Sequence, residues 1–465
     1  MIPLRTLTVA LAASLASACT MIPDYQRPAA PVPASFPNAA QAAAATSPDA
    51  IAWRDYFTDA RLREVIALAL VNNRDLRVAV LNIEKARAQY RIQRADLFPS
   101  IGASGSQNAQ RLPGDLTSSG EANVARVYSA TVGFAAYELD FFGRVRSLNA
   151  QALESYLGTE EARRSAQISL VAEVASAWLT LASDHERQAL ARSTYESRLK
   201  SHNLIRRSVE AGAAPALDLH QSQQLLQSAR ADVARFGTFV AQGENALALV
   251  VGAPVPAELL PTTLSDSVSA IAELPAGVPS DVLTRRPDIL QAERALRAAN
   301  ANIGAARAEF FPRITLTADA GTASSTLDGL FSGGSGTWSF MPQIRIPIFE
   351  AGRLQANLEV TEVQRDISVA QYEKSIQTAF REVADALAER STLAERLDAR
   401  RLQLESTQAA FRLSEARYKG GVDSFLVLLD AERSLYLAEQ ELILVRLNDA
   451  ANRVTLYKVL GGGWQ

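Results

Sequence analysis

The sequence contains little of the chemistry that enzymes and metal proteins use. Its 465 residues include one cysteine and three histidines, His185, His202 and His220. One cysteine cannot close an internal disulfide, and no Cys/His cluster has the spacing of a metal site. Phosphate-loop, nucleophile-elbow and dinucleotide motifs are missing too, and the glycine-rich stretch 329–336 lies in a predicted hairpin loop. These absences argue against an enzyme, a bound metal and a cofactor.

Excess charge of one sign and long apolar runs are also scarce. The net charge is −3 and the pI is about 5.9, so nothing favours nucleic acid as a partner. Beyond the N-terminal region, no run of about 18 apolar residues is present, which argues against a transmembrane helix. An exported chain of this kind is soluble, tethered to a membrane, or a β-barrel.

The N-terminus has the pattern of a bacterial secretory signal. A short basic start, Met1–Arg5, precedes an apolar run and then Ala16-Ser17-Ala18, directly before Cys19. This pattern predicts a signal peptide over 1–18. Two interpretations of Cys19 are open: lipidation, or an ordinary cleavage that leaves it first. The mature segment 19–60 is expected to be extended, and its Pro/Ala-rich part, 20–50, is expected not to pack.

The chain contains an internal repeat. Asp75–Ile101 aligns without a gap with Asp288–Ile314, and later the offset falls by four residues, so that Gly212 meets Gly421. The repeat predicts two copies of one unit joined by a Pro-rich linker. The expected parts are repeat 1 at 61–252, an equatorial linker at 253–284, repeat 2 at 285–461 and a tail at 462–465.

Each copy begins with a helix followed by a β-hairpin. Pro99 and Pro312 end the first helices, because proline lacks the N–H donor and disfavours helical geometry in the preceding residue. Apolar residues then alternate with polar ones, which predicts hairpins at about 100–138 and about 313–348. Their loops, 107–126 and 322–336, are expected to face outside the cell. Two aromatic residues of the second hairpin, Trp338 and Phe340, are expected to be either interfacial or lipid-facing.

Very long helices follow the glycines Gly143 and Gly352. The stretch 144–211 has no proline and 353–419 has neither proline nor glycine, so each could extend about 100 Å. Helices of this length indicate coiled-coil-like packing. Gly212 and the pair Gly420-Gly421 permit tight reversals, which predicts helical hairpins at about 144–252 and about 353–460. The remaining expectation is an α+β fold with four strands in each chain.

Four membrane-length strands cannot close a barrel, since about eight is the practical minimum. Open sheet edges are not tolerated in lipid. The barrel must therefore be shared between two, three or four chains, and physics alone does not choose among them.

With these parts in place, the chain resembles the TolC family of outer-membrane efflux factors, and within it the OprM-like lipoprotein branch that serves RND multidrug pumps. The residues that carry the resemblance are Arg285-Arg286-Pro287-Asp288-Ile289, Gln93-Arg94-Ala95-Asp96-Leu97-Phe98-Pro99, Tyr418-Lys419-Gly420-Gly421-Val422-Asp423 and Leu456-Tyr457-Lys458-Val459-Leu460-Gly461-Gly462-Gly463-Trp464. It covers nearly the whole mature chain.

The resemblance implies a homotrimer with a 12-stranded barrel in the outer membrane and an α-helical tunnel through the periplasm. It implies lipid anchoring through Cys19. It also implies that the hairpin tips at Gly212, Gly420 and Gly421 dock to a periplasmic adaptor, which connects to an inner-membrane RND pump.

One set of residues is a candidate gate. Leu426, Asp430 and Arg433 share one helical face, and three copies of Asp430 would form an acidic ring. From the residues alone, a solvated pair of little energetic weight is the favoured interpretation of Asp430 and Arg433. The resemblance implies that these positions, with Tyr418 nearby, form the closed periplasmic aperture.

Two functional alternatives remain open. A periplasmic coiled-coil scaffold would not explain the two alternating hairpins. The outer-membrane duct of a type I protein secretion system uses the same fold, although the lipoprotein-like start and the quoted motifs favour small-molecule efflux.

Overall fold

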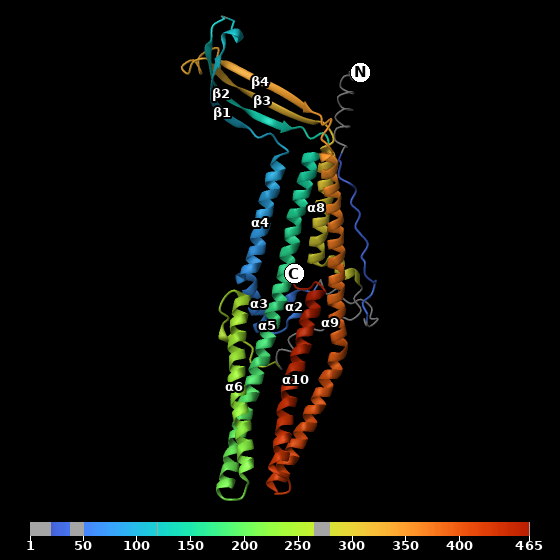
Figure 1. Cartoon of the computed structure of the whole chain (residues 1–465). Helices are drawn as coiled ribbons and strands as arrows, with labels where there is room; N and C mark the ends of the chain where they lie inside the picture. Colours follow the sequence, from blue (N-terminus) through green and yellow to red (C-terminus); the bar gives the residue numbers. More distant parts are fainter. Residues whose placement is uncertain (1–19, 38–50, 119, 265–279, 465) are drawn as a thin grey trace. The chain divides into compact units, whose positions relative to one another are not determined.

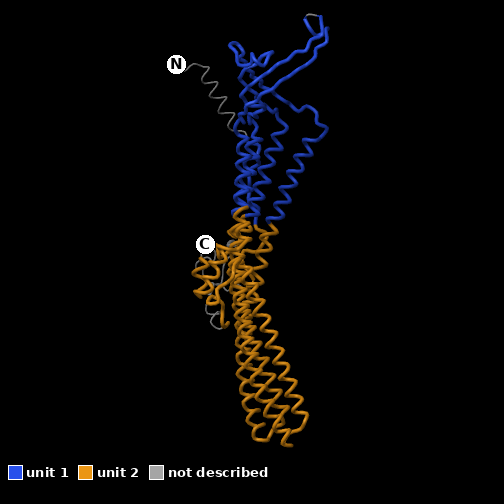
Figure 2. Tube along the Cα trace, turned by 90° about the vertical axis from the view of Figure 1, so that its left-hand side faces the viewer, with its two compact units in different colours: residues 1–29, 82–160, 291–372 blue, residues 30–81, 161–290, 373–465 orange. Residues whose placement is uncertain are grey.

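The computed structural model describes residues 20–37, 51–118, 120–264 and 280–464. The predicted signal peptide at 1–18 and Cys19 lie outside these ranges. The chain forms two compact units: unit 1 comprises 1–29, 82–160 and 291–372, and unit 2 comprises 30–81, 161–290 and 373–465 (Figure 2). Both repeats contribute to both units, so compactness and sequence repetition divide the chain differently.

The elements alternate between helices and one sheet, and the predicted α+β fold class is confirmed. The helices are α2 (Trp53–Tyr56), α3 (Ala60–Asn72), α4 (Arg74–Ala95), α5 (Arg144–Glu210), α6 (Ala216–Val251), α8 (Pro287–Ala308), α9 (Arg353–Lys419) and α10 (Phe425–Val459), with 3₁₀ turns η2 (Gly114–Leu116), η3 (Ala257–Leu259) and η4 (Ser280–Arg285). The strands are β1 (Gly102–Leu112), β2 (Asn123–Glu138), β3 (Arg313–Ser324) and β4 (Gly336–Arg345).

The four strands form one antiparallel sheet in unit 1, in the order β1-β2-β3-β4 (Figure 1). The sheet corrects the predicted hairpin limits. Strand pairing continues to Leu112 opposite Asn123, so the predicted loop 107–126 is too long. The sequence does not reveal the length of β1, because small and polar residues occupy both faces of this strand. At the other end β4 stops at Arg345, and the following Pro347 has no N–H for a sheet ladder.

The register sorts the side chains onto two chemically different faces. One face, here called the apolar face, carries Val132, Phe134, Ile314, Leu316, Trp338, Phe340 and Ile344. The other, here called the hydroxyl face, carries Ser104, Ser106, Ser129, Thr131, Thr315, Thr317, Asp319 and Ser339. Neighbouring strands share side-chain hydrogen bonds there, such as Ser104 to Thr131 at 3.0 Å and Ser106 to Ser129 at 2.8 Å. The sheet is thus suited to lipid on one side and water on the other.

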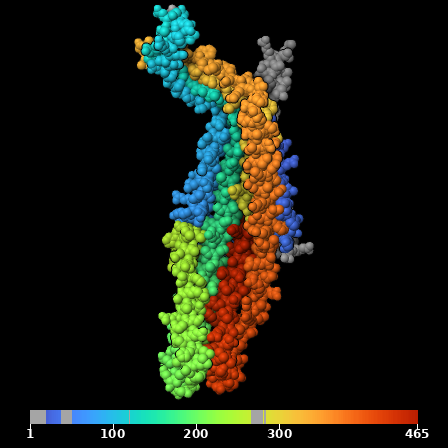
Figure 3. All heavy atoms as spheres, viewed as in Figure 1, coloured from blue at the N-terminus to red at the C-terminus, as the bar shows by residue number. Residues whose placement is uncertain are grey.

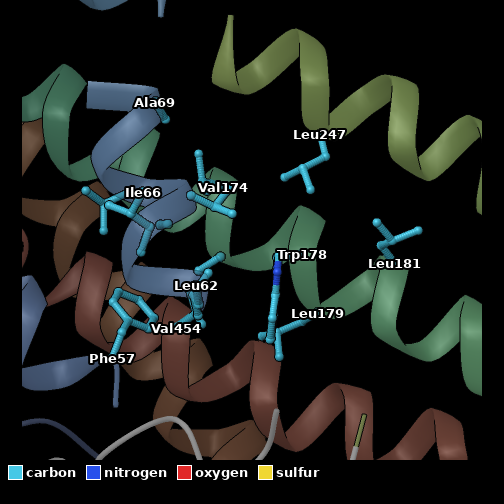
Figure 4. Packing of buried hydrophobic residues seen from close by; sticks show 14 of the residues in the cluster. Phe57, Leu62, Ile66, Ala69, Val174, Trp178, Leu179, Leu181, Leu247 and Val454 are labelled. Atoms are coloured by element: carbon cyan, nitrogen blue, oxygen red, sulfur yellow. The ribbon is translucent and has the colours of Figure 1, made fainter. Parts of the chain in front are cut away.

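The largest hydrophobic core lies in unit 2. Figure 4 shows Leu62, Ile66 and Ala69 of α3 near Val174 and Trp178 of α5. Trp178 is fully buried, and its indole N–H donates to the carbonyl of Leu259 at 3.0 Å. This core therefore joins α3, α5 and the linker region after α6.

Aromatic residues connect the start of the chain to its end within this core. The rings of Tyr56 and Tyr457 stack with centroids 4.0 Å apart, and the Tyr457 hydroxyl donates to the Ile51 carbonyl at 2.6 Å. The segment 19–60 is therefore not extended throughout, because α2 forms where Trp53, Tyr56 and Phe57 can be buried.

The prediction that the Pro/Ala-rich segment does not pack is wrong for its described part. In unit 1, Arg27 donates twice to the buried Glu293, at 3.1 and 2.6 Å. In unit 2, Phe36 is 4% exposed and stacks on Phe380 at 4.9 Å. Proline keeps the segment extended, but an extended segment can still place single side chains into sites on folded helices.

One helix bears on the prediction of no transmembrane helix beyond the N-terminal region. One described helix, α5, contains an 18-residue window apolar enough to cross a membrane, and 56% of that window is buried inside the protein. Because Val171, Val174 and Trp178 of α5 belong to the unit 2 core, the hydrophobicity of this helix is explained by packing.

Candidate functional site

Unit 2 contains both predicted helical reversals, which lie side by side (Figure 3). At the first, between α5 and α6, Gly212 has a left-handed φ of 73°. Its N–H donates to the carbonyl of Val209 at 2.9 Å, and that of Ala213 donates to Ser208 at 2.8 Å. This is a Schellman motif, in which two carbonyls that helix termination leaves free are satisfied.

The second reversal, between α9 and α10, repeats this geometry. Gly421 has φ of 70°, its N–H donates to Tyr418 at 3.0 Å, and that of Val422 donates to Arg417 at 2.9 Å. Gly421 occupies the position that Gly212 occupies in the first copy. Gly420, in contrast, is not among the residues with positive φ.

Only the second reversal carries an ion-pair clasp. The Arg417 guanidinium donates to both carboxylate oxygens of Asp423, at 2.7 and 2.8 Å, across the turn. The hydrogen bond from Arg417 lowers the pKa of the Asp423 carboxyl. At the equivalent positions the first reversal has Ser208 and Ala214. The clasp was missed from sequence, although opposite charges flanking a Gly-Gly turn are a usable signal.

A small hydrophobic cluster joins the two hairpins next to the reversals. Ile205 of α5, Leu225 of α6, and Phe425 and Leu429 of α10 are all nearly fully buried there. The predicted gate residue Tyr418 packs against this cluster, with its ring centroid 5.5 Å from that of Phe425. Burial, and then the charge of Asp218, raise the pKa of Tyr418.

Two of the other predicted gate residues on α10, Leu426 and Asp430, do not belong to this cluster. Leu426 is 54% exposed, Asp430 is exposed and Arg433 is half-buried, whereas Phe425 and Leu429 face the cluster. Among the described residues, neither Asp430 nor Arg433 forms an ion pair. The structure thus brings Leu426 and Asp430 to an open surface, whereas Tyr418 is half-buried against the cluster.

A buried polar network between the hairpins was not predicted. Arg198 of α5 has a side chain only 5% exposed, donates to Glu432 of α10 at 3.0 Å, and donates to the Leu225 carbonyl of α6 at 3.2 Å. One turn on, the Tyr436 hydroxyl donates to Asp232 of α6 at 3.1 Å. Burial and the Asp232 charge raise the pKa of Tyr436 to about 12.

This network binds three helices together close to the reversals. Removing one partner of a buried pair leaves an uncompensated charge in the interior. This destabilises the protein far more than breaking an ion pair on the surface does. Sequence offered no signal for it, because its members are more than 200 residues apart and pair only through tertiary packing.

The predicted strand–helix junctions form a second symmetric feature, in unit 1. Gly143 and Gly352 have φ of 78° and 82°, directly before α5 and α9. The turns before Pro99 and Pro312 also match: Phe98 N–H donates to Ala95 at 3.0 Å, and Phe311 to Ala308 at 3.1 Å. The two copies thus share these turns and glycine conformations, although Ala351, directly before Gly352, also has a positive φ of 50°.

The junction surrounds a polar cavity of about 280 Å³. Glu138 in its wall accepts two hydrogen bonds from Arg144, at 2.8 and 2.7 Å, and pairs with Arg313 at 2.7 Å. One carboxylate therefore holds two arginine side chains where the strands end. Across the described residues, no group of three His, Cys, Asp or Glu side chains could hold a metal ion.

Comparison with known proteins gives a consistent result. The family model described as "Outer membrane efflux protein" matches residues 65–253 and 278–462. The chain is similar to the "Probable efflux pump outer membrane protein TtgC" of Pseudomonas putida, with 51% identity over 98% of this chain and 95% of the relative.

Solved structures agree in fold. A membrane protein from Pseudomonas aeruginosa superposes with a TM-score of 0.88 at 44% identity, covering 96% of this chain and 98% of the other. The MtrE outer membrane channel of Neisseria gonorrhoeae, in its open state, gives a TM-score of 0.87 at 40% identity, covering 96% and 99%.

The two neighbouring glycines at the second reversal provide a matched test. Alanine at Gly421 must adopt left-handed geometry, which costs about 1–2 kcal/mol. We expect Gly421→Ala to speed amide hydrogen exchange at the tip by roughly ten-fold. Gly420→Ala, without that strain, should exchange like the wild type. Equal behaviour of the two variants would contradict the role assigned to Gly421.

The clasp predicts a pH response confined to one reversal. Because the pKa of Asp423 is lowered in the folded protein, the clasp stabilises the tip above the ordinary carboxyl pKa of about 3.9 and is lost as pH falls through the lowered value. Amide exchange at 415–425, corrected for intrinsic rates, should lose protection in acid. Arg417→Gln should abolish this change, and the reversal at Gly212 serves as the internal control.

Proposed function

The chain belongs to the outer membrane efflux protein family, and from that membership we propose that it is the outer-membrane channel of a tripartite RND-type multidrug efflux system. It passes small molecules from the periplasm to the exterior. The observation that carries the proposal is the sheet: four strands with one apolar face, one hydroxyl face and two edges that no described strand covers.

Such a sheet functions only when it is shared. Among the described strands, β1 pairs only with β2 and β4 only with β3, so β4 of one copy is free to pair with β1 of the next. Three copies give 12 strands, enough to enclose a water-filled lumen lined by the hydroxyl face. We therefore propose a homotrimer in contact with outer-membrane lipid through the apolar face.

The helical reversals are the proposed contact with partner proteins. Their backbone is fixed by the Schellman motifs at Gly212 and Gly421, with Gly420 beside the second, so they present a rigid surface. A periplasmic adaptor docks at these tips and connects the channel to an inner-membrane RND pump.

Leu426, Asp430 and Arg433 form the proposed periplasmic aperture, together with Tyr418. Leu426 and Asp430 face away from the cluster that joins the hairpins, so three chains can bring their Asp430 side chains toward one axis. Tyr418 supports α10 from the packed side. Opening then requires a shift of α9 and α10 against α5 and α6, which the Arg198–Glu432 pair opposes.

The remaining parts of the proposal concern targeting and chemistry. Residues 1–18 are the signal peptide and Cys19 carries the lipid anchor, which keeps the protein at the outer membrane while its helices extend into the periplasm. The protein catalyses no reaction and uses no cofactor, metal or nucleic acid.

Deletion of the gene separates efflux from the alternative of type I protein secretion. Loss of the channel should increase susceptibility to several drugs at once, measured as minimum inhibitory concentrations, and restoring the gene should reverse this. Unchanged susceptibility together with loss of a secreted protein from the medium would favour the secretion duct instead.

The aperture can be tested on one side chain. Asp430→Ala should raise the ion conductance of the purified channel in a planar bilayer, because it removes the acidic ring from the constriction. Ser434→Ala is the matched control, since Ser434 is exposed one turn further along α10. Conductance unchanged in Asp430→Ala would remove Asp430 from the aperture.

A further inference from the structure

The apolar face of the sheet carries only two charged side chains in the described strands, and they are neighbours. Arg111 of β1 pairs in register with Val124, and Arg126 of β2 pairs with Ala109. Residues in register share a face, and those two positions apart along a strand share it too. Arg111 and Arg126 are therefore diagonal neighbours on this face, about 7–8 Å apart by the usual strand spacing.

Both arginines lie at the end of the sheet where the β1–β2 loop connects the strands. The helices α4 and α5 join these strands at the opposite end. In an outer-membrane barrel the loop end faces outside, so the pair lies at the level of the outer leaflet. A charge on the lipid face is strongly unfavourable at the middle of a bilayer but tolerated near the interface.

Neither arginine is neutralised within the described chain. Both side chains are exposed and neither forms an ion pair there, although the acidic residues Asp115 and Glu121 occur in the connecting loop. Elsewhere in the sheet, Arg313 pairs with Glu138 at 2.7 Å. Two neighbouring guanidinium groups without a carboxylate partner favour the binding of an anion.

The next register pair supplies a further donor. Gln107 Nε2 donates to the Tyr128 hydroxyl oxygen at 3.2 Å. Because that oxygen accepts from Gln107, the tyrosine proton is free to donate elsewhere. Tyr128 is two residues from Arg126 on the same face, so its hydroxyl adds to the two guanidinium groups.

We propose that Arg111 and Arg126, assisted by Tyr128, bind the phosphate group of an outer-leaflet lipid. Val124, which pairs with Arg111, and Val132, further along the same face, then contact the acyl chains of the same lipid. The proposal rests on the outer-membrane channel function, because only a bilayer places a phosphate beside this apolar face. The site fixes the depth of the barrel in the membrane through a specific lipid contact.

The test uses the full-length protein purified in mild detergent. Native mass spectrometry during titration with bisphosphorylated lipid A, and with lipid A stripped of its phosphates, measures both affinities. The wild type should bind the phosphorylated lipid about ten-fold more tightly, as expected for charge-assisted hydrogen bonds. Arg111→Gln/Arg126→Gln should bind both lipids equally.

Two matched variants guard against indirect effects. Arg345→Gln removes one positive charge from the opposite face and the opposite end of the sheet, and should bind like the wild type. Arg111→Lys/Arg126→Lys keeps both charges without the planar fork and should retain part of the preference.

Two outcomes would overturn the proposal, and they differ in what else they affect. Equal binding of phosphorylated lipid by the wild type and by Arg111→Gln/Arg126→Gln, with both proteins conducting ions normally, rejects the site and leaves the channel function intact. Wild-type protein that is absent from isolated outer membranes rejects the channel function and the lipid site together.

Discussion

Unsatisfied backbone hydrogen bonds along two sheet edges are the constraint on which the rest of this protein depends. β1 and β4 each pair with a single strand, and a bilayer offers no water to their outer N–H and C=O groups. Each chain therefore needs further copies to complete its sheet. This requirement explains why one face of the sheet is apolar while the other is covered with hydroxyl groups, since closure turns these faces toward lipid and water.

The repeat is preserved in backbone geometry more strictly than in side chains. Gly212 and Gly421 end their helices with the same hydrogen bonds, and Gly143 and Gly352 precede the long helices with the same left-handed conformation. The surroundings differ, because only the second reversal has an Arg417–Asp423 clasp. The left-handed backbone at these positions favours glycine whatever the neighbouring residues are. The side chains around each turn are not constrained in this way and can differ between the two copies.

The elements that depend on nearby residues alone were predictable from the sequence. The absence of proline predicted α5, and the absence of both proline and glycine predicted α9. Glycines predicted the reversals, and alternation predicted the second hairpin. The full extent of β1 was not visible, because its Gly, Ala, Ser and Gln residues show no contrast between faces. The packing of Phe36 and the Arg198–Glu432 pair depend on partners hundreds of residues away, for which a single sequence has no periodic signal.

The attachment of the N-terminal segment also constrains the order in which the chain can fold. Arg27 binds Glu293 across 266 residues of sequence, and the Pro23 carbonyl accepts from Asn300 across 277. The first part of the mature chain to be synthesised thus has no binding site until α8 of the second repeat exists. Contacts of such long range close late, after local helices and hairpins. The segment that contains Pro23 and Arg27 is accordingly among the last to reach its native position. It binds only after α8 of the second repeat has folded.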